Sequence, residues 1–135
     1  MSNFVLFDTS ILVDQLRTGR HQEQIQSVTG LVRTSSVVLA ELWRGASKAA
    51  ERDVLRVLEK NYPVLVPTSQ NWIESGELLN KLRLLHGFLP DKLRDLHFDV
   101  LIVLTARSHG ARLITSNRRD FELIASVRPV ELEFW

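Results

Sequence analysis

Four carboxylates occupy positions from which acidic side chains could gather into one site. Asp8 follows the apolar run FVLF, Glu41 lies inside VVLAELW, Asp99 precedes VLIVLTA, and Asp120 follows SNRR. Two carboxylates about 4 Å apart repel each other by roughly 4 kcal/mol at an effective dielectric constant near 20. Three or four of them in a partly buried pocket therefore need either raised pKa values or a bound cation.

The available donor atoms restrict which cation this would be. The chain has no cysteine, and its four histidines are scattered along the sequence. A ligand set made only of oxygen atoms selects a hard ion such as Mg²⁺ or Mn²⁺. Such an ion can activate a water molecule and stabilise a leaving oxygen during phosphodiester cleavage. The acidic residues therefore suggest a metal-dependent nuclease.

Each carboxylate also has a simpler explanation. Asp8 could cap the N-terminus of a helix, and Glu41, at the border of an apolar face, could lie on the surface. Asp99 could be a first-turn partner of a helix dipole. Asp120 follows Asn117 by three residues and could belong to a helix-capping arrangement. Taken singly, none of the four positions decides between these alternatives.

Hydrophobic patterning predicts strands that alternate with helices. Short apolar runs predict strands over residues 4–7, 31–34, 64–66, 112–115 and 130–132. Helical periodicity predicts helices over residues 11–16, 21–29, 37–46, 49–60, 69–86, 98–110 and 116–124, with a loop at 87–92. Thr9 or Ser10 would cap the first of these helices. This order predicts a single α/β domain over residues 1–135, with a central parallel sheet in a three-layer α/β/α arrangement.

The predicted fold offers a place where the carboxylates could meet. Ligands of parallel α/β sheets bind outside the carboxyl ends of the strands. Asp8 follows the first predicted strand directly, whereas Glu41, Asp99 and Asp120 fall in helices that follow a strand or a loop. We therefore expect all four at one edge of the sheet.

Composition excludes several classes of protein. The net charge of +1 argues against a uniformly basic surface, although 13 of the 17 basic residues are arginines, whose planar group suits phosphate. Arg44, Arg118 and Arg119 lie near the acidic segments and could guide the phosphate backbone of a nucleic acid. No apolar run approaches the roughly 20 residues that span a membrane, and no basic leader precedes the first apolar segment. We therefore expect a cytoplasmic protein.

The ordered motifs resemble those of PIN-domain nucleases, and among them the VapC-like toxins of bacterial toxin–antitoxin pairs. FVLFDTSILVD resembles the family's opening strand–Asp–Thr–helix element, and TSSVVLAELWRGA resembles its glutamate-bearing element. FDVLIVLTARSHGARLITSNRRDFELI resembles the third and fourth elements. Each motif is weak alone, but together they follow the family's order and intervals over nearly the whole chain.

The resemblance assigns a role to each acidic residue. Asp8, Glu41 and Asp99 match the family's three core acidic metal ligands. Asp120 matches a fourth and more variable position, whose role would be indirect, through water. Asp95, four residues before Asp99, could compete for the third role, but the segment VLIVLTA follows Asp99 as it does in the family.

The resemblance also assigns roles to neighbouring polar residues. Thr9 matches a hydroxyl that orients the first aspartate, with Ser10 as a helper at a position where many relatives have Asn. Thr115, Ser116 and Asn117 match a turn beside the site, where Asn117 would position a ligand or a substrate phosphate.

The family's biology implies an Mg²⁺- or Mn²⁺-dependent endoribonuclease that cuts structured RNA. It also implies a homodimer and a VapB-like antitoxin, whose C-terminal segment would wrap the toxin and insert an arginine at the acidic site. The C-terminal Glu-Phe-Trp resembles the subgroup that cuts initiator tRNA, so tRNA is one candidate substrate. The sequence leaves open whether Trp135 is docked or exposed.

Other interpretations fit less well. A haloacid-dehalogenase-like phosphatase needs a second carboxylate two residues after the nucleophile, where this chain has Ser10, and it also needs a well-placed late lysine. A receiver-like domain needs an acidic pair before its phosphorylated aspartate. A PIN-like domain without catalytic activity, which only binds partners, stays open, although four intact acidic positions argue against it.

Overall fold

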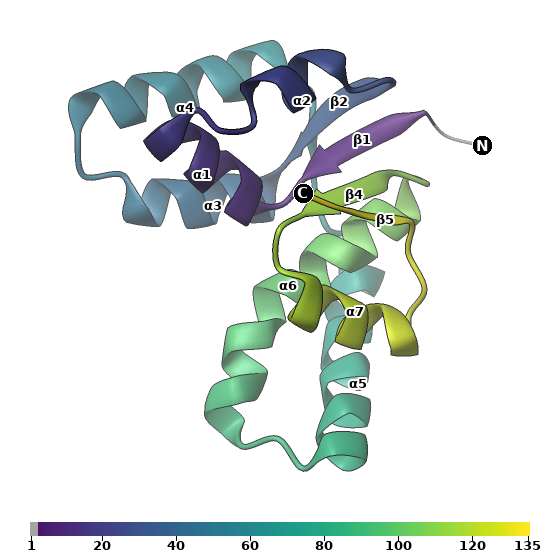
Figure 1. Ribbon diagram of the computed structural model, residues 1–135. Coiled ribbons are helices and arrows are strands. Elements are labelled where there is room, and N and C mark those ends of the chain that lie inside the picture. The colour runs from purple at the N-terminus through teal and green to yellow at the C-terminus, as the bar shows by residue number, and fades with distance from the viewer. Residues whose placement is uncertain (1–2) are drawn as a thin grey trace.

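Five strands form one parallel sheet in the computed structural model, which describes residues 3–135 (Figure 1). Their spatial order is β3-β2-β1-β4-β5, and every neighbouring pair is parallel. The strands are β1 (Phe4–Phe7), β2 (Leu31–Ser35), β3 (Val64–Leu65), β4 (Arg112–Thr115) and β5 (Leu132–Phe134). This arrangement confirms the predicted α/β class with its central parallel sheet.

Helices cover both faces of the sheet. Figure 1 shows α1 to α4 gathered on one side of the strands and α5 to α7 on the other. This division follows from the strand order, because right-handed connections that run across the sheet in opposite directions, from β1 out to β3 and from β3 back to β4 and β5, place their helices on opposite faces. The helices are α1 (Thr9–Thr18), α2 (Gln22–Ser27), α3 (Ser36–Gly45), α4 (Ala49–Asn61), α5 (Ser69–His86), α6 (Pro90–Ser108) and α7 (Arg118–Val127).

Helix α6 is the most deeply buried element. Every residue from 100 to 106 is buried, as its nearly uninterrupted apolar sequence predicts. It packs against α5 and α7 and shares one core cluster with Leu6 of β1 and Leu113 of β4. Close packing of this kind fixes the helix against the sheet, and so positions Asp99.

The strand order reverses between β1 and β4. From β1 the chain builds outward to β2 and β3, and it then returns to the other side of β1 as β4 and β5. The backbone N–H of Asp8 donates to the carbonyl of Ile114 at 2.8 Å, which joins the two carboxyl ends. Reversal points of this type are where open α/β sheets bind ligands.

The predicted start of the buried helix is wrong. Helix α6 begins at Pro90 rather than at residue 98, and the loop before it is short. Gly87 ends α5 in the left-handed conformation, with φ at 67°. Pro90 occupies the first turn of α6. The first two turns were missed because most of their side chains are polar and partly exposed. Two smaller shifts place β5 at 132–134 instead of 130–132 and the start of α7 at 118 instead of 116.

Candidate active site

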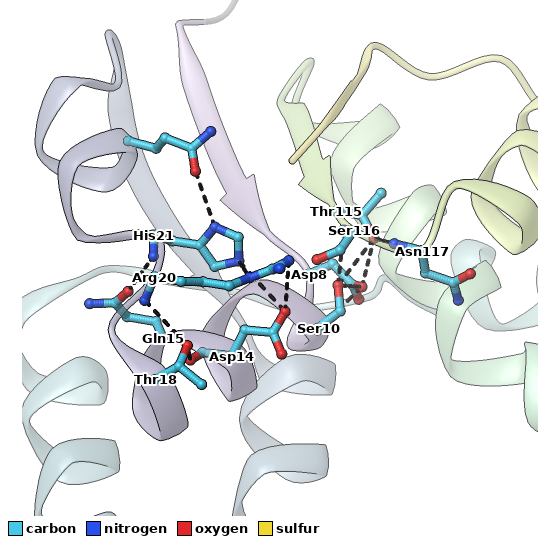
Figure 2. Close-up of polar contacts among 11 residues, drawn as sticks. Asp8, Ser10, Asp14, Gln15, Thr18, Arg20, His21, Thr115, Ser116 and Asn117 are labelled. Carbon is cyan, nitrogen blue, oxygen red and sulfur yellow. Dashed lines mark hydrogen bonds and ion pairs between the residues drawn. The ribbon is translucent and has the colours of Figure 1, made fainter.

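Asp8 lies buried at the end of β1, and one of its two carboxylate oxygens is held by three hydrogen bonds (Figure 2). Oδ2 accepts from the hydroxyls of Ser10 and Thr115, both at 2.8 Å, and from the Ser10 backbone N–H at 3.4 Å. Across residues 3–135, no hydrogen bond reaches Oδ1. Asp8 itself is the N-cap of α1, instead of Thr9 or Ser10. The cap uses Oδ2 and leaves Oδ1 available to a ligand.

The turn after β4 orients both hydroxyls. The Ser116 N–H donates to Ser10 Oγ at 3.1 Å, and the Asn117 N–H donates to Thr115 Oγ1 at 3.0 Å. Because each hydroxyl accepts a backbone N–H, its own proton is free to point at Asp8. Segments more than 100 residues apart in sequence therefore fix the orientation of one carboxylate.

Glu41 is half-buried on α3, and its Oε1 accepts a hydrogen bond from the Thr9 hydroxyl at 2.8 Å. Thr9 therefore orients Glu41, whereas the family pattern suggested that it would orient Asp8. Burial raises the pKa of Glu41, and the charge of Asp8 raises it further; the Thr9 hydrogen bond and the charge of Arg44 act in the opposite direction.

Asp99 lies within α6, not in its first turn, so the helix-dipole explanation is wrong. Burial is the largest of the influences that raise its pKa to about 8, and the charges of Asp8, Glu41 and Asp120 raise it as well. The charge of Lys92 opposes them. The pKa of Asp99 is thus raised by the charges of all three other candidate carboxylates.

Asp120, on α7, has both carboxylate oxygens engaged. Oδ1 pairs with the Lys92 ammonium at 3.0 Å, and Oδ2 accepts from the Asn117 side-chain amide at 3.3 Å. Asn117 is also the N-cap of α7, because its Oδ1 accepts from the Asp120 backbone N–H at 3.4 Å. The capping explanation is therefore correct for Asn117, and it accounts for the orientation of Asp120.

The oxygen atoms of the four carboxylates are chemically suited to bind a hard divalent cation. Burial and three neighbouring carboxylates make the ionised form of Asp99 unfavourable, and a cation would relieve this. Every candidate ligand atom is an oxygen, as Mg²⁺ and Mn²⁺ prefer. Within residues 3–135, however, no three acidic or histidine side chains lie close enough together to hold a metal ion between them. The four carboxylates are an open cluster, coupled through their charges.

A comparison with protein-family models decides the family. The model of the PIN domain matches residues 5–127, from β1 to the end of α7. The chain belongs to the PIN-domain family. The matched segment of this PIN domain contains all four carboxylates and both hydroxyls that hold Asp8.

Solved structures share the fold over nearly their whole length. DNA-bound VapBC from Salmonella typhimurium is 24% identical, with 100% of this chain and 99% of that chain covered and a TM-score of 0.72. VapBC-1 from nontypeable Haemophilus influenzae is 21% identical, with 98% of both chains covered and a TM-score of 0.72. A toxin–antitoxin complex from Klebsiella pneumoniae is 26% identical, with 93% and 94% covered and a TM-score of 0.63. A search of curated proteins found no match.

Lys92 is a member of the site that sequence reasoning missed. It pairs with Asp120 and lowers the pKa of Asp99, yet it lies in a segment that was predicted to be a loop. A usable signal was present. Pro90 favours a helix start, and within such a helix Lys92 and Asp99 are seven residues apart, which places them on the same face.

The three arginines singled out from the sequence differ in their surroundings. Arg118 pairs with Glu122 at 2.7 Å, and its guanidinium carbon lies 4.0 Å from the centre of the Phe134 ring. Arg119 is exposed, and no carboxylate of residues 3–135 lies within ion-pair distance of it. Arg44 is exposed at the end of α3. Arg118 is thus partly committed to packing, and Arg119 is free for an external phosphate.

The remaining polar cluster in Figure 2 surrounds His21, which is buried between α1 and α2. Its Nε2 accepts from Arg20 Nε at 3.1 Å, so its Nδ1 donates to Gln24 at 3.1 Å. The Trp135 ring lies 5.7 Å from this imidazole and 5.4 Å from the Phe7 ring. The chain end is therefore docked beside β1.

No helix of the described residues has the length and apolar character needed to cross a membrane.

Proposed function

We propose that this PIN domain is an Mg²⁺- or Mn²⁺-dependent endoribonuclease and the toxin of a VapBC-type toxin–antitoxin pair. The observation that carries the proposal is the raised pKa of Asp99, which results from burial and from the charges of Asp8, Glu41 and Asp120. This electrostatic coupling occurs where β1 and β4 end side by side, the usual ligand position in such sheets.

Each polar side chain has a role in this proposal. Asp8, Asp99 and Glu41 would hold the cation, and Asp120 would act through water because both of its oxygens are engaged. A bound divalent ion would make an attacking water more acidic and neutralise charge on the leaving oxygen.

The surrounding hydrogen bonds define the supporting roles. Ser10 and Thr115 keep Oδ2 of Asp8 occupied, which leaves Oδ1 for the cation. Thr9 holds Glu41, and Asn117 holds Asp120. All of these groups are positioned before any substrate arrives, which reduces the cost of organising the site during reaction.

An antitoxin partner is supported by an apolar groove. A cavity of about 250 Å³ lies among α1, α2, α4 and the sheet, and its walls are mainly apolar: Phe7, Leu12, Leu16, Ile25, Val54, Leu58 and Tyr62. The similar structures from Salmonella typhimurium and Haemophilus influenzae are VapBC assemblies. We infer that a VapB-like antitoxin packs apolar side chains into this groove and directs an arginine to the acidic cluster.

A homodimer is supported by apolar side chains exposed on α5. Trp72, Ile73, Leu84 and Leu85 are each more than half exposed. Trp72 and Ile73 lie near the start of α5, and Leu84 and Leu85 lie near its end. Exposed apolar side chains of this kind are available to a protein interface. The substrate proposed is structured RNA, with tRNA as the first candidate to test.

The decisive experiment compares Asp8→Asn with the wild type. Purified protein is incubated with bulk tRNA and Mn²⁺, and products are resolved on a sequencing gel. We expect cleavage by the wild type and none by Asp8→Asn, whose circular dichroism spectrum should match the wild type. Asp53→Asn, an exposed aspartate on α4, is the matched control and should cleave normally.

Two results would overturn the proposal. Cleavage by Asp8→Asn at the wild-type rate would show that the activity does not depend on this site. A folded wild-type protein that leaves tRNA and mixed-sequence RNA intact, with Mg²⁺ or with Mn²⁺, would favour a PIN domain that only binds partners.

A further inference from the structure

A second cavity adjoins the acidic site between α3 and α6. It has a volume of about 280 Å³. Glu41 lines this cavity and also belongs to the acidic cluster, so the two spaces share a wall. The lining residues are Glu41, Arg44, Arg94, Asp95, His97 and Phe98.

The size of the cavity limits what it could hold. Since a water molecule occupies about 30 Å³ of liquid, the space corresponds to roughly nine waters. It lies just below the range of roughly 300–1,000 Å³ typical of small-molecule sites. A single planar group with its attached sugar is compatible with this volume, whereas a helix is not.

Phe98 and Arg44 supply the side chains that a nucleotide would need. Phe98 is half-buried, packs against the core and lines the cavity. The Arg44 guanidinium carbon lies 5.9 Å from the centre of the Phe98 ring. No carboxylate of the described chain is within ion-pair distance of Arg44. An aromatic ring can stack on a base, and an unpaired guanidinium can bind the adjacent phosphate.

The other walls carry donors and acceptors for the edge of a base. The Ser75 hydroxyl donates to the Trp72 carbonyl at 2.6 Å, so the contact of 3.0 Å between Ser75 and His97 uses an N–H from His97 Nε2. In a neutral ring His97 Nδ1 is then an acceptor. The Asp95 carboxylate is a second acceptor. The Arg94 guanidinium pairs with Asp91 through one nitrogen and has further N–H groups that can donate.

We propose that this cavity is a nucleobase subsite that binds the nucleotide next to the scissile phosphate, with Phe98 as the stacking surface and Arg44 on the phosphate. The inference rests on the proposed ribonuclease function, because the shared wall at Glu41 places the nucleotide beside the acidic cluster. It makes the identity of one base a determinant of where RNA is cut.

The test uses oligoribonucleotides of mixed sequence and Mn²⁺, with cleaved ends identified by sequencing. We expect the wild type to prefer one base at a position next to the cut. Phe98→Leu should flatten this preference and raise KM by about fivefold to a hundredfold, the usual effect of losing one stacked base. Arg44→Gln should raise KM for every sequence alike, because a phosphate contact carries no information about the base. Phe98→Tyr keeps an aromatic ring and should retain the preference.

Arg56→Gln is the matched control. The Arg56 guanidinium carbon lies 5.5 Å from the centre of the Trp43 ring, a similar cation–aromatic contact outside the cavity. This variant should keep the wild-type KM and base preference. If Phe98→Leu fails to fold by circular dichroism, the KM of Arg44→Gln still decides the question: a rise supports the subsite, and the wild-type value contradicts it.

Binding separates failure of the subsite from failure of the nuclease. Fluorescence anisotropy with labelled rA₈, rC₈, rG₈ and rU₈, without divalent metal, measures the affinity for each base independently of cleavage. A wild type that cuts no RNA refutes the proposed function, but unequal affinities that Phe98→Leu equalises would still support the subsite. A base preference and affinities unchanged in both Arg44→Gln and Phe98→Leu would overturn it.

Discussion

At the scale of single residues, the two oxygens of Asp8 have different tasks. Oδ2 is saturated by Ser10 and Thr115, whereas Oδ1 accepts no hydrogen bond from the described residues. A carboxylate that is free to rotate would expose either oxygen. Groups that orient a metal ligand typically contribute tenfold to a hundredfold in metal affinity or activity.

The double variant Ser10→Ala, Thr115→Val tests this orientation. We expect the Mn²⁺ concentration for half-maximal cleavage of tRNA to rise about tenfold or more, because Asp8 loses both hydroxyl donors. Titrating Mn²⁺ against the initial cleavage rate measures the effect. Ser126→Ala removes an exposed hydroxyl on α7 and serves as the control. A Mn²⁺ dependence that matches the wild type would show that the hydroxyls serve only the fold.

Asp99 makes the stability of the metal-free protein depend on pH. Its folded-state pKa of about 8 lies above its ordinary value of 3.8. Between these values the folded protein retains a proton that the unfolded chain has lost, so the contribution of this carboxyl to stability falls as pH rises. Asp99→Asn removes this dependence.

We therefore expect the Tm of Asp99→Asn to exceed that of the wild type increasingly as pH rises from 5 to 8. Differential scanning fluorimetry in EDTA measures this difference. Adding Mn²⁺ at pH 8 should raise the Tm of the wild type more than that of Asp99→Asn, since a cation relieves the buried charge. Parallel Tm curves for the two proteins across this pH range would contradict the assignment. Asp53→Asn should run parallel to the wild type.

Residue chemistry could be predicted from sequence only where contacts are local. The contact between Asp8 and Ser10 spans two residues, and Asp8 was recognisable from the apolar strand before it. The contact between Asp8 and Thr115 spans 107 residues, so spacing alone carries no information about it. Thr9 illustrates the same limit, because its partner Glu41 is on another helix.

At the scale of elements, β1 must be placed accurately because it carries Asp8. Its pairing with β2 begins at the register Phe4 with Leu31, directly after Gly30. Gly30 has φ 116°, and a Cβ there would lie 2.6 Å from the carbonyl oxygen of Asn3. Only glycine suits this conformation and this close backbone approach.

Gly30→Ala should therefore destabilise the protein by about 1–3 kcal/mol, the usual cost of a strained backbone position. Urea unfolding followed by tryptophan fluorescence measures the loss. Gly87→Ala is the matched control. Gly87 also has positive φ, at 67°, but a Cβ there meets nothing within 4 Å, so the expected loss is smaller. Equal losses for the two variants would show that the contact with Asn3 is unimportant.

Element prediction succeeded where a pattern was strong and local. The long amphipathic segment predicted at 69–86 matches α5, which begins after the Thr68 cap and ends at Gly87. The start of α6 was missed because its early residues are polar, and their burial depends on packing against α5 and α7. Because of that error, Lys92 was not recognised as part of the site, and Asp99 was predicted at a helix terminus instead of within the helix.

At the scale of the whole molecule, an acidic site has to attract a polyanion. The net charge of +1 provides no general attraction, so local arginines near the site must contribute. Arg119 is exposed and unpaired among the described residues, whereas Arg118 pairs with Glu122 and packs on Phe134. The two neighbours on α7 should therefore contribute unequally to RNA binding.

We expect Arg119→Ala to reduce the slope of log K against log salt concentration by about 1, the loss of one phosphate contact. Arg118→Ala should reduce it less, because that guanidinium already has partners within the chain. Anisotropy of labelled tRNA without divalent metal, over a range of KCl concentrations, measures the slopes. Arg83→Gln, on α5, should leave the slope unchanged. If the double variant Arg118→Ala, Arg119→Ala also keeps the wild-type slope, RNA reaches the acidic cluster by a path that avoids α7, and the arginine-bearing cavity between α3 and α6 becomes the principal phosphate contact.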